Sequence, residues 1–519
     1  MVRTAKDYRE AMRAEREIYI DGARVADIAT HPAFAPLIDL RAHIYDMQLD
    51  PAHRDVLTKT AQGQTDTVSA ALPFSQSDWW AKRRATDRIL DDIGGIAART
   101  GDETVGEFWA LHDCRDALVD LDPQFGGNID RHVRAAIEDD LFNVSANTDS
   151  KGDRSRPPQN QDPDILLRVV RETDAGVIVR GAKFETGAAY ADRAYTKPNI
   201  AAWGDRLAPE YAVGFVCDLN AKGLKFICRS GFARPGTERD YPLSNRFDEI
   251  EALVVFDDVL IPWEDVLFYR QPRAATLIRA TLHRYSAFAF VHRILRFGDM
   301  LIGAALMNVR HTGLEGQQGV RDKLAKLAVW REGLHAHLTA AIALGEKSPA
   351  GLMMPNQSLL HAGRVHATAC LHEMVNITRE LCGGQVSLTP SAAAFEAPET
   401  EAWLAKYYAQ GDTWSAEERR KLMAFARDLV SSDYAGHRLG LQLFAQSPAY
   451  AQLASVYRHF DWDGPLAMVR DAAGLEAQSS ASAAAGDGRI PSQGACGWHD
   501  PKLPRVKRSL VNLDDYFET

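Results

Sequence analysis

Residues 147–187 read NTDSKGDRSRPPQNQDPDILLRVVRETDAGVIVRGAKFETG, a polar loop followed by two segments of alternating character. The period-two alternation over 165–171 and again over 177–184 predicts two β-strands. Thr173-Asp174-Ala175-Gly176 favours a turn between them, because Asp supports an Asx-turn and Gly adopts positive φ. The stretch is therefore predicted to be a β-hairpin with a polar loop, 147–164, at its mouth.

The hairpin lies in a region, residues 147–271, where period-two alternation replaces the helical period found on either side. Residues 1–146 are predicted to be mainly helical, and residues 272–475 contain long helical patterns typical of a bundle. Residues 476–519 begin with an Ala/Ser/Gly-rich linker and end in a C-terminal arm. This order predicts an α+β fold with an N-terminal helical domain, a central β domain and a C-terminal helical bundle.

Periodicity also locates the individual elements. A further hairpin is predicted over 17–24, where alternation surrounds the turn pair Asp21-Gly22. Other candidate strands are 199–203, 210–217, 224–229 and 251–256. Candidate helices are 35–48, 79–98, 104–121, 128–142, 274–310, 318–345, 356–382, 415–432 and 434–446, and residues 49–76 are expected to be loop-like.

Composition limits the classes of function. The chain has 519 residues, 60 basic and 70 acidic, and a net charge of −10, without the basic excess of a nucleic-acid-binding protein. Its 6 cysteines lack C-x-x-C spacing, which favours a reducing compartment. The N-terminus is charged from the start, and no apolar run approaches the ~20 residues of a membrane span. We expect a cytoplasmic protein that binds neither nucleic acid nor membrane.

Six segments resemble the 4-hydroxyphenylacetate 3-hydroxylase superfamily, which joins reduced-flavin monooxygenases of phenols to 4-hydroxybutyryl-CoA dehydratase. They are EIYIDGARVADIATHPAF (17–34), SKGDRSRPP (150–158), ETDAGVIVRGAK (172–183), DYPLSNRFDEIEALVVFDDVLIPWEDV (240–266), GDMLIGAALM (298–307) and DWDGPLAMV (461–469). They occur in the family's order along the chain. The resemblance implies an acyl-CoA dehydrogenase-like fold with a central β-barrel domain, a homotetramer, and FAD bound between the β domain and the helical bundle.

The resemblance also implies which residues contact the flavin. Two loop segments match parts that touch the flavin and its phosphates, one strand end matches a part beside the isoalloxazine ring, and a helix end matches a part near the adenine. The implied cofactor-binding residues are Ser145, Ala146, Asn147, Thr148, Lys151, Arg154, Glu185, Thr186, Gly187, Ser447, Pro448, Ala449 and Tyr450. Backbone N–H groups and Arg154 suit a pyrophosphate, and the Thr186 hydroxyl suits a flavin heteroatom.

The sequence departs from the dehydratase branch at its metal site. That branch holds a [4Fe–4S] cluster with three cysteines and one histidine. Here Cys114 and His283 stand at two of those positions, but Ala110 and Phe290 stand at the others. Alanine and phenylalanine cannot ligate iron. We therefore predict no iron–sulfur cluster and no other metal.

The sequence also departs from the phenol hydroxylase branch, which carries an Arg and a Tyr in one motif and a His before the flavin loop. Arg115 is the candidate for the Arg, with Arg99 as a competing match, and Ser145 stands where the His is expected. A phenol hydroxylase needs a base, because phenolate is the better nucleophile. His112 and His283 are the candidate bases, so the predicted catalytic set is Arg115, His112, His283 and Ser145.

No G-x-G-x-x-G segment follows a strand, and the chain has no P-loop. A separate NAD(P)H-flavin reductase is therefore expected to supply FADH2. The segments GGQVSLTPSAAAF (383–395) and DWDGPLAMV resemble nitrophenol and chlorophenol monooxygenases. The predicted function is that of an FADH2-dependent monooxygenase, the oxygenase component of a two-component system, which hydroxylates a small aromatic or phenol-like substrate through a flavin C4a-hydroperoxide. The alternatives are a cluster-free flavin dehydratase or isomerase acting on an acyl-CoA-like substrate, and a non-catalytic homologue.

Overall fold

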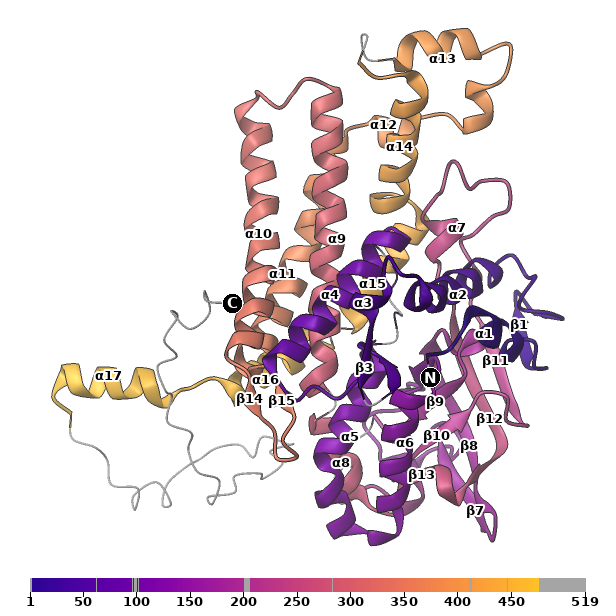
Figure 1. Ribbon diagram of the computed structural model, residues 1–519, viewed down its shortest axis with the longest axis vertical. Helices are drawn as coiled ribbons and strands as arrows, with labels where there is room; N and C mark the ends of the chain where they lie inside the picture. The colour runs from indigo at the N-terminus through magenta and orange to yellow at the C-terminus, as the bar shows by residue number, and fades with distance from the viewer. Residues whose placement is uncertain are drawn as a thin grey trace. The chain divides into compact units, whose positions relative to one another are not determined.

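A computed structural model describes residues 2–61, 63–95, 97, 100, 102–199, 206–281, 283–409, 413–445 and 447–475 of the chain. Along these residues helices come first, then sheets, then helices again (Figure 1). The predicted α+β order is therefore confirmed. Most of the predicted strand 199–203, the competing Arg99 and the tail 476–519 lie outside the described residues.

The N-terminal helices are α1 (Ala5–Ala11), α2 (Ala35–Leu49), α3 (Arg54–Leu57), α4 (Gln76–Ile93), α5 (Asp102–Leu121) and α6 (Gly126–Glu138). Ser75 starts α4 with a capping box, in which its hydroxyl accepts from the Asp78 N–H and Asp78 accepts in return. The expectation of a loop over 49–76 was wrong in part. The strands β3 (Thr58–Ala61) and β4 (Gln64–Thr67) pair antiparallel, and their polar, threonine-rich sequence hides the alternation.

Two sheets form the centre of the chain. The larger, in the order β2-β1-β11-β12-β8-β6 with β7 also on β8, contains β1 (Glu17–Ile20), β2 (Ala23–Arg24), β6 (Thr148–Asp149), β7 (Arg168–Thr173), β8 (Gly176–Thr186), β11 (Leu224–Cys228) and β12 (Glu251–Pro262). The smaller, in the order β13-β10-β9-β5, contains β5 (Asn143–Ser145), β9 (Arg193–Thr196), β10 (Val213–Asp218) and β13 (Val266–Tyr269). The predicted hairpin is confirmed as β7 and β8, which pair antiparallel.

The two sheets share one apolar core. Phe215 of the smaller sheet meets Phe256 of the larger sheet edge to face, with ring centroids 6.0 Å apart. The predicted β-barrel thus takes the form of two packed sheets. The N-terminal segment joins them, because β1 pairs in parallel with β11. A boundary at residue 146 therefore leaves two strands of the larger sheet, β1 and β2, in the helical part.

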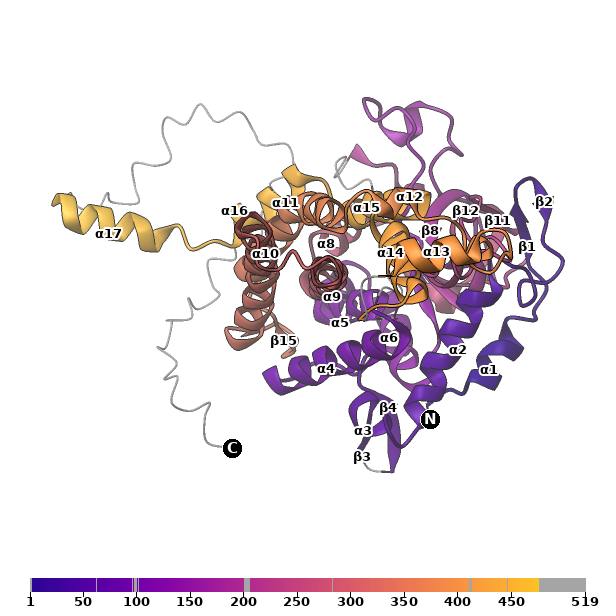
Figure 2. The ribbon, with the colours of Figure 1, turned by 90° about the horizontal axis from the view of Figure 1, so that it is seen from above.

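The C-terminal half is helical. Its elements are α8 (Pro272–Thr281), α9 (His283–His311), α10 (Gln318–Ala343), α11 (Gln357–Cys382), α12 (Gln385–Leu388), α13 (Glu401–Tyr408), α14 (Ala416–Val430), α15 (Asp433–Ala445), α16 (Ala449–His459) and α17 (Asp463–Ala473), with short β14 (Glu346–Lys347) and β15 (Met353–Met354) after α10. Helices α9, α10 and α11 lie side by side in both ribbon views (Figures 1 and 2). Leu301, Leu334 and Leu371 are fully buried between them. The short α7 (Ser244–Phe247) precedes β12.

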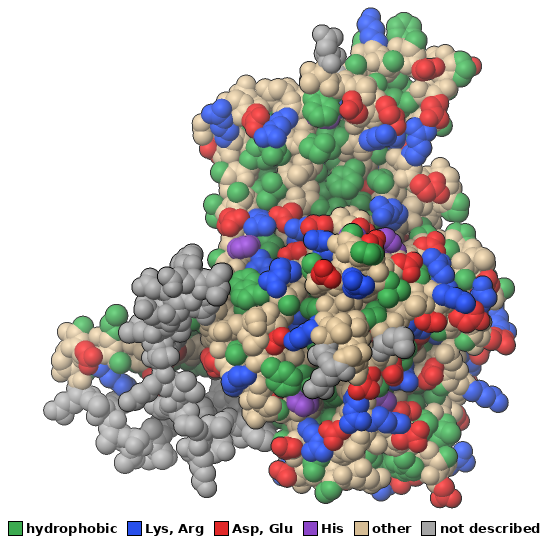
Figure 3. Space-filling model, viewed as in Figure 1, with side chains coloured by type: hydrophobic (Ala, Val, Ile, Leu, Met, Phe, Trp, Pro, Cys, Tyr) green, Lys and Arg blue, Asp and Glu red, His purple; other side chains and the backbone are tan. Residues whose placement is uncertain are grey.

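Acidic and basic side chains are interspersed over the face seen in Figure 3, and hydrophobic side chains gather over the upper part of the helical bundle. None of the described helices is both long enough and apolar enough to cross a membrane. Helices α16 and α17 expose several large apolar side chains: Tyr450, Leu453, Tyr457, Leu466, Met468 and Val469.

Candidate active site

Polar residues from α5 meet the edge of the smaller sheet. β5 pairs in parallel with β9, with Ser145 opposite Tyr195. The Ser145 hydroxyl lies 3.0 Å from the Thr104 hydroxyl of α5, and the Asn147 amide donates to Glu107 Oε2 at 2.9 Å. Ser145 and Asn147, both predicted to contact the flavin, are thus hydrogen-bonded to Thr104 and Glu107 of α5, which sequence analysis did not name.

Glu107 is a buried carboxyl among mostly neutral partners. Glu103, one turn earlier on α5, accepts from the Arg293 guanidinium at 2.8 Å, whereas Glu107 accepts from the Asn147 amide. Burial raises the pKa of Glu107, and the nearby Lys197 ammonium opposes that rise. Glu107 is therefore the carboxylate at this edge whose protonation state is most easily changed by what binds beside it.

Lys197 follows β9 and is 1% exposed. Among the described residues its Nζ has no hydrogen-bond partner. Burial lowers the pKa of this amine, and the Glu107 carboxylate opposes that fall. The pairing of β5 with β9 ends at Ser145 and Tyr195, so Asn147 and Lys197 follow the two paired strands. The charges of Glu107 and Lys197 act on one another.

A buried ion pair fixes the backbone of this segment. Lys183 of β8 forms an ion pair with Asp149 of β6, and their side chains are 1% and 6% exposed. Lys183 Nζ also donates to the Lys197 carbonyl at 2.8 Å, and Asp149 Oδ2 accepts from the Asn199 N–H at 2.9 Å. The larger sheet thus holds the chain on both sides of Pro198, directly after Lys197.

His283 opens α9 and lies on the other side of Lys197. Its Nε2 is 3.5 Å from the Ser447 hydroxyl and its Nδ1 is 3.4 Å from the Ser286 hydroxyl. Burial lowers the pKa of His283 well below its usual range, and the charges of Arg364 and Lys197 lower it further. The ring is therefore neutral and resists taking a proton. Arg364 of α11 also donates to Ser447 at 3.4 Å.

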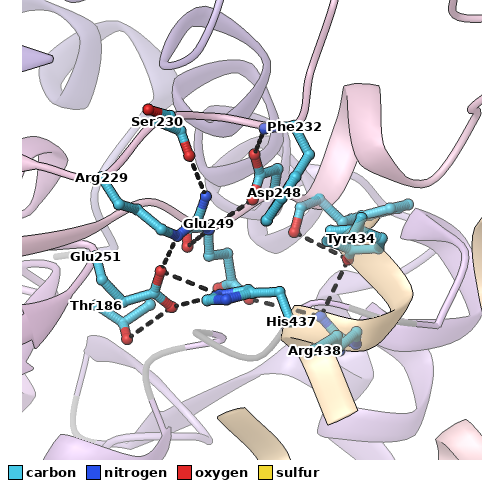
Figure 4. A network of polar contacts seen from close by, with 11 residues as sticks. Thr186, Arg229, Ser230, Phe232, Asp248, Glu249, Glu251, Tyr434, His437 and Arg438 are labelled. Atoms are coloured by element: carbon cyan, nitrogen blue, oxygen red, sulfur yellow. Dashed lines mark hydrogen bonds and ion pairs between the residues drawn. The ribbon is translucent and has the colours of Figure 1, made fainter. Parts of the chain in front are cut away.

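Thr186 ends β8 inside the polar network of Figure 4. Its hydroxyl donates to Glu251 Oε1 at 3.4 Å, and Glu251 also binds Arg229 and His437, the latter at 3.2 Å. Figure 4 shows the side chains of Thr186 from β8 and His437 from α15 both directed at the Glu251 carboxylate. The network therefore links the ends of β8 and β12 to α15. Gly187, next in the chain, has φ +85, a conformation strained for any residue with a Cβ.

The remaining predicted residues lie around this site or away from it. Lys151 and Arg154 are exposed on the loop after β6, Ala146 is fully buried in the core, and Thr148 pairs with Phe184 of β8. Glu185 is buried beside Thr186. Pro448, Ala449 and Tyr450 are exposed at the start of α16, directly after Ser447.

The predicted Arg115 and His112 are not brought to this edge. Arg115 forms a two-point ion pair with Asp130 of α6, at 2.6 and 2.8 Å. His112 stands five residues beyond Glu107, which places it roughly 140° away around the helix. Cys114, the remnant of the cluster motif, is a buried thiol 3.3 Å from the Thr281 hydroxyl. Of the predicted catalytic set, the structure brings Ser145 and His283 toward Lys197 and Glu107.

The edge of the smaller sheet has polar atoms that suit a polar ligand. Among the described residues, four buried atoms there have no hydrogen-bond partner: Asn147 Oδ1, Tyr195 OH, Thr196 Oγ1 and Lys197 Nζ. Nearly all buried polar atoms in proteins are hydrogen-bonded, so four on adjacent segments are unusual. Tyr195 and Thr196 are consecutive residues of β9, so their side chains face opposite sides of the strand. A ring with carbonyl and N–H groups, such as a flavin, supplies donors and acceptors for part of this set. These residues therefore fit the implied cofactor.

Sequence analysis missed Glu107, Lys197 and Lys183. A signal for Lys183 was present, because it shares the inward face of β8 with Val177 and Val179, where a charge needs a buried partner. Glu103 and Glu107 likewise repeat at four-residue spacing in a helix whose other residues there are largely buried. Lys197 gave no comparable pattern.

The chain matches known proteins along nearly its whole length. Residues 4–268 match the profile "4-hydroxyphenylacetate 3-hydroxylase N terminal", and residues 273–474 match "4-hydroxyphenylacetate 3-hydroxylase C terminal". The 4-hydroxyphenylacetate 3-monooxygenase oxygenase component of Thermus thermophilus is 28% identical over 88% of this chain and 95% of its own length.

A second relative and a solved structure agree with that match. The (3S)-3-amino-3-(3-chloro-4-hydroxyphenyl)propanoyl-[peptidyl-carrier protein] monooxygenase of Streptomyces globisporus is 32% identical over 83% of this chain and 82% of its own length. The oxygenase component of 4-hydroxyphenylacetate 3-monooxygenase complexed with FAD and 4-hydroxyphenylacetate superposes with a TM-score of 0.84 at 26% identity, covering 91% of this chain and 98% of that one. The predicted resemblance is confirmed, and the chain belongs to the 4-hydroxyphenylacetate 3-hydroxylase family.

Proposed function

We propose that this chain is the oxygenase component of a two-component, FADH2-dependent monooxygenase that hydroxylates a small phenol-like substrate. The observation that carries the proposal is the group of buried polar atoms at the edge of the smaller sheet, opposite a buried carboxyl. Family membership supports the choice of flavin, because a solved relative is complexed with FAD.

The residues of the loop after β5 and of the end of β8 would hold the flavin ring. Asn147 and Thr186 offer polar side chains to its heteroatoms, and the positive φ of Gly187 lets backbone approach without a Cβ. Lys151 and Arg154 are exposed cations on the adjoining loop and suit the pyrophosphate. Ser447 and the exposed start of α16 remain the candidates for the adenine.

When bound, reduced FAD supplies the two electrons with which one atom of O2 enters the ring as a hydroxyl group while the other leaves as water. The protein must orient the ring and exclude water from it. Tyr195 and Thr196 beside it are both fully buried. His283 is held neutral by burial, which suits it to hydrogen bonding with an aromatic hydroxyl.

A separate NAD(P)H-flavin reductase is the expected partner, since the name "oxygenase component" of the Thermus relative implies a second component. A homotetramer is the expected assembly. Its support is the row of exposed apolar side chains on α16 and α17, where Tyr450 and Met468 are 73% and 74% exposed. The cytoplasm, where reduced flavin is made, remains the predicted compartment.

The test combines binding and product analysis. The full chain is titrated with FAD and with reduced FAD under anaerobic conditions, and the reduced complex is then mixed with phenols in the presence of labelled O2. The expected result is tight binding of reduced FAD and one labelled oxygen atom per molecule of hydroxylated product. Flavin binding with O2-independent conversion of an acyl-CoA would favour the dehydratase alternative, and failure to bind either form of FAD would favour the non-catalytic one.

A further inference from the structure

We infer that Glu107 and Lys197 act as one proton-accepting unit, in which the carboxylate takes the proton of a bound phenol and the ammonium stabilises the phenolate. The inference rests on the proposed function and deepens it. It replaces the two histidines that sequence analysis named as candidate bases with a carboxylate and an amine from α5 and the end of β9.

The first support is position. Asn147 donates to Glu107 at 2.9 Å, and Lys183 Nζ joins Asp149, two residues after Asn147, to the Lys197 carbonyl. The side chains of Glu107 and Lys197 are buried, at 5% and 1% exposure. Lys197 Nζ lacks a hydrogen-bond partner among the described residues, so this amine is available to pair with the hydroxyl group of a ligand.

The second support is charge balance. A base at this site must take a proton. Burial raises the pKa of Glu107 and lowers the pKa of His283. Burial therefore favours protonation of the carboxylate and opposes protonation of the imidazole. The imidazolium form of His283 is opposed by the Arg364 and Lys197 charges, whereas protonation of Glu107 removes a buried negative charge. The carboxylate is thus matched to proton transfer near neutral pH.

The other charged groups around the pair are already engaged. Glu103 pairs with Arg293, and Lys183 pairs with Asp149. The further cations that act on the pair or on His283 are Arg279 of α8 and Arg364 of α11. Among the described residues, the Lys197 ammonium is thus the buried cation left to stabilise a bound phenolate.

The proton step balances without any co-reactant. The phenol O–H bond breaks, the proton forms an O–H bond with the Glu107 carboxylate, and the electron pair stays on the phenolate oxygen, which faces the Lys197 ammonium. The net charge of the site does not change. Bulk pH therefore has little influence on the ionisation of the bound phenol as long as Glu107 is ionised before the phenol binds.

That independence of pH is the signature to test. The probe is 4-nitrophenol, whose phenolate is yellow and whose phenol is not, added to the full chain with oxidised FAD. With the native chain, the bound phenolate fraction should stay nearly constant with pH above the raised pKa of Glu107, and it should fall at lower pH as Glu107 takes its proton from solvent. In Glu107→Gln the proton must go to solvent, so the bound fraction should rise with pH. In Lys197→Met the bound phenol should stay neutral, and Glu107→Asp should restore part of the native behaviour.

Turnover gives a second readout with reduced FAD and O2. Glu107→Gln should lower kcat/KM about 10²–10⁴-fold near neutral pH, and the loss should shrink as pH rises and the phenol ionises in solution. The matched control is Asp120→Asn, an exposed carboxylate on the same helix, which should leave both readouts unchanged. Circular dichroism of each variant establishes that the fold is kept.

The outcomes separate this inference from the proposed function. If the native chain hydroxylates the phenol and Glu107→Gln has the same pH profile, the pair is not the base, although the monooxygenase assignment stands. A native chain that leaves the nitrophenol spectrum unchanged also overturns the pair. If the native chain ionises the probe independently of pH but never oxygenates it, the pair stands and the monooxygenase assignment fails.

Discussion

The buried ion pair between Lys183 and Asp149 should be among the most costly interactions to break in the described chain. Their side chains are 1% and 6% exposed, so water cannot replace a lost partner. Removing one member of a buried pair costs about 3–5 kcal/mol, because the other charge is left uncompensated. We therefore expect Lys183→Met to lower the free energy of unfolding by about 3–5 kcal/mol.

The double variant Lys183→Met/Asp149→Leu should be less destabilised than the sum of its single variants. It leaves no isolated charge and loses mainly two hydrogen bonds, from Lys183 to the Lys197 carbonyl and from the Asn199 N–H to Asp149. Each such loss costs about 1–3 kcal/mol when a buried group is left unpaired. The coupling energy of the cycle should therefore reach several kcal/mol.

The assay is urea unfolding followed by tryptophan fluorescence and circular dichroism, with agreement of the two probes required before midpoints are converted to free energies. Lys225→Met is the matched control. Lys225 forms an ion pair with Asp257 in the same sheet, but the two side chains are 35% and 56% exposed, so its loss should cost far less than the loss of Lys183. The reasoning is refuted if Lys183→Met costs no more than Lys225→Met, or if the single effects simply add.

Three further predictions concern acid stability and the flavin. Burial lowers the pKa of His361 to about 3, with Arg364 as the second cause, so the folded state binds fewer protons than the unfolded state below about pH 6.5. As pH falls from about 6.5 toward 3, the unfolded state takes a proton at His361 that the folded state does not, so the free energy of unfolding should fall by up to about 4–5 kcal/mol. His361→Gln should therefore flatten the plot of unfolding midpoint against pH. An unchanged plot contradicts this. Thr186→Val should weaken FAD binding about 5–10-fold in a fluorescence titration. The protein should lose little stability, because the Thr186 hydrogen bond to Glu251 is long at 3.4 Å. An unchanged affinity for FAD would show that Thr186 does not contact the flavin. Arg154→Ala should weaken FAD binding about tenfold at low salt and much less at high salt, since an exposed cation is screened; a salt-independent loss would point to a structural role.

The sequence predicted the long helices and the alternating strands well, for a physical reason. Helices such as α10 and α11 have one buried face, and β8 buries every second residue, so their burial repeats along the chain. β5, β9 and β13 were missed because nearly all their residues are buried. A fully buried strand has no alternation, and two of these three strands form the edge that carries the candidate site.

The site was predicted in part for the same reason. Ser145 and Asn147 were named from resemblance, and the structure places them at the sheet edge. Glu107 was not named. Its partners lie far along the chain: the Asn147 amide, 40 positions later, donates to it, and the charge of Lys197, 90 positions later, acts on it. Arg115 was named from a local motif, but its partner Asp130 lies on the neighbouring helix. Such pairings are set by packing and leave no periodic signal.

The placement of Glu107 and Lys197 on two separate elements has an evolutionary consequence. A substitution at either position alone leaves one buried charge without its counterpart, which costs several kcal/mol, whereas replacing both removes the charge altogether. The two positions should therefore change together in the family's history. Relatives with an uncharged residue in place of Glu107 should lack the amine at the position of Lys197, and such a group would have to find another base for its own substrate.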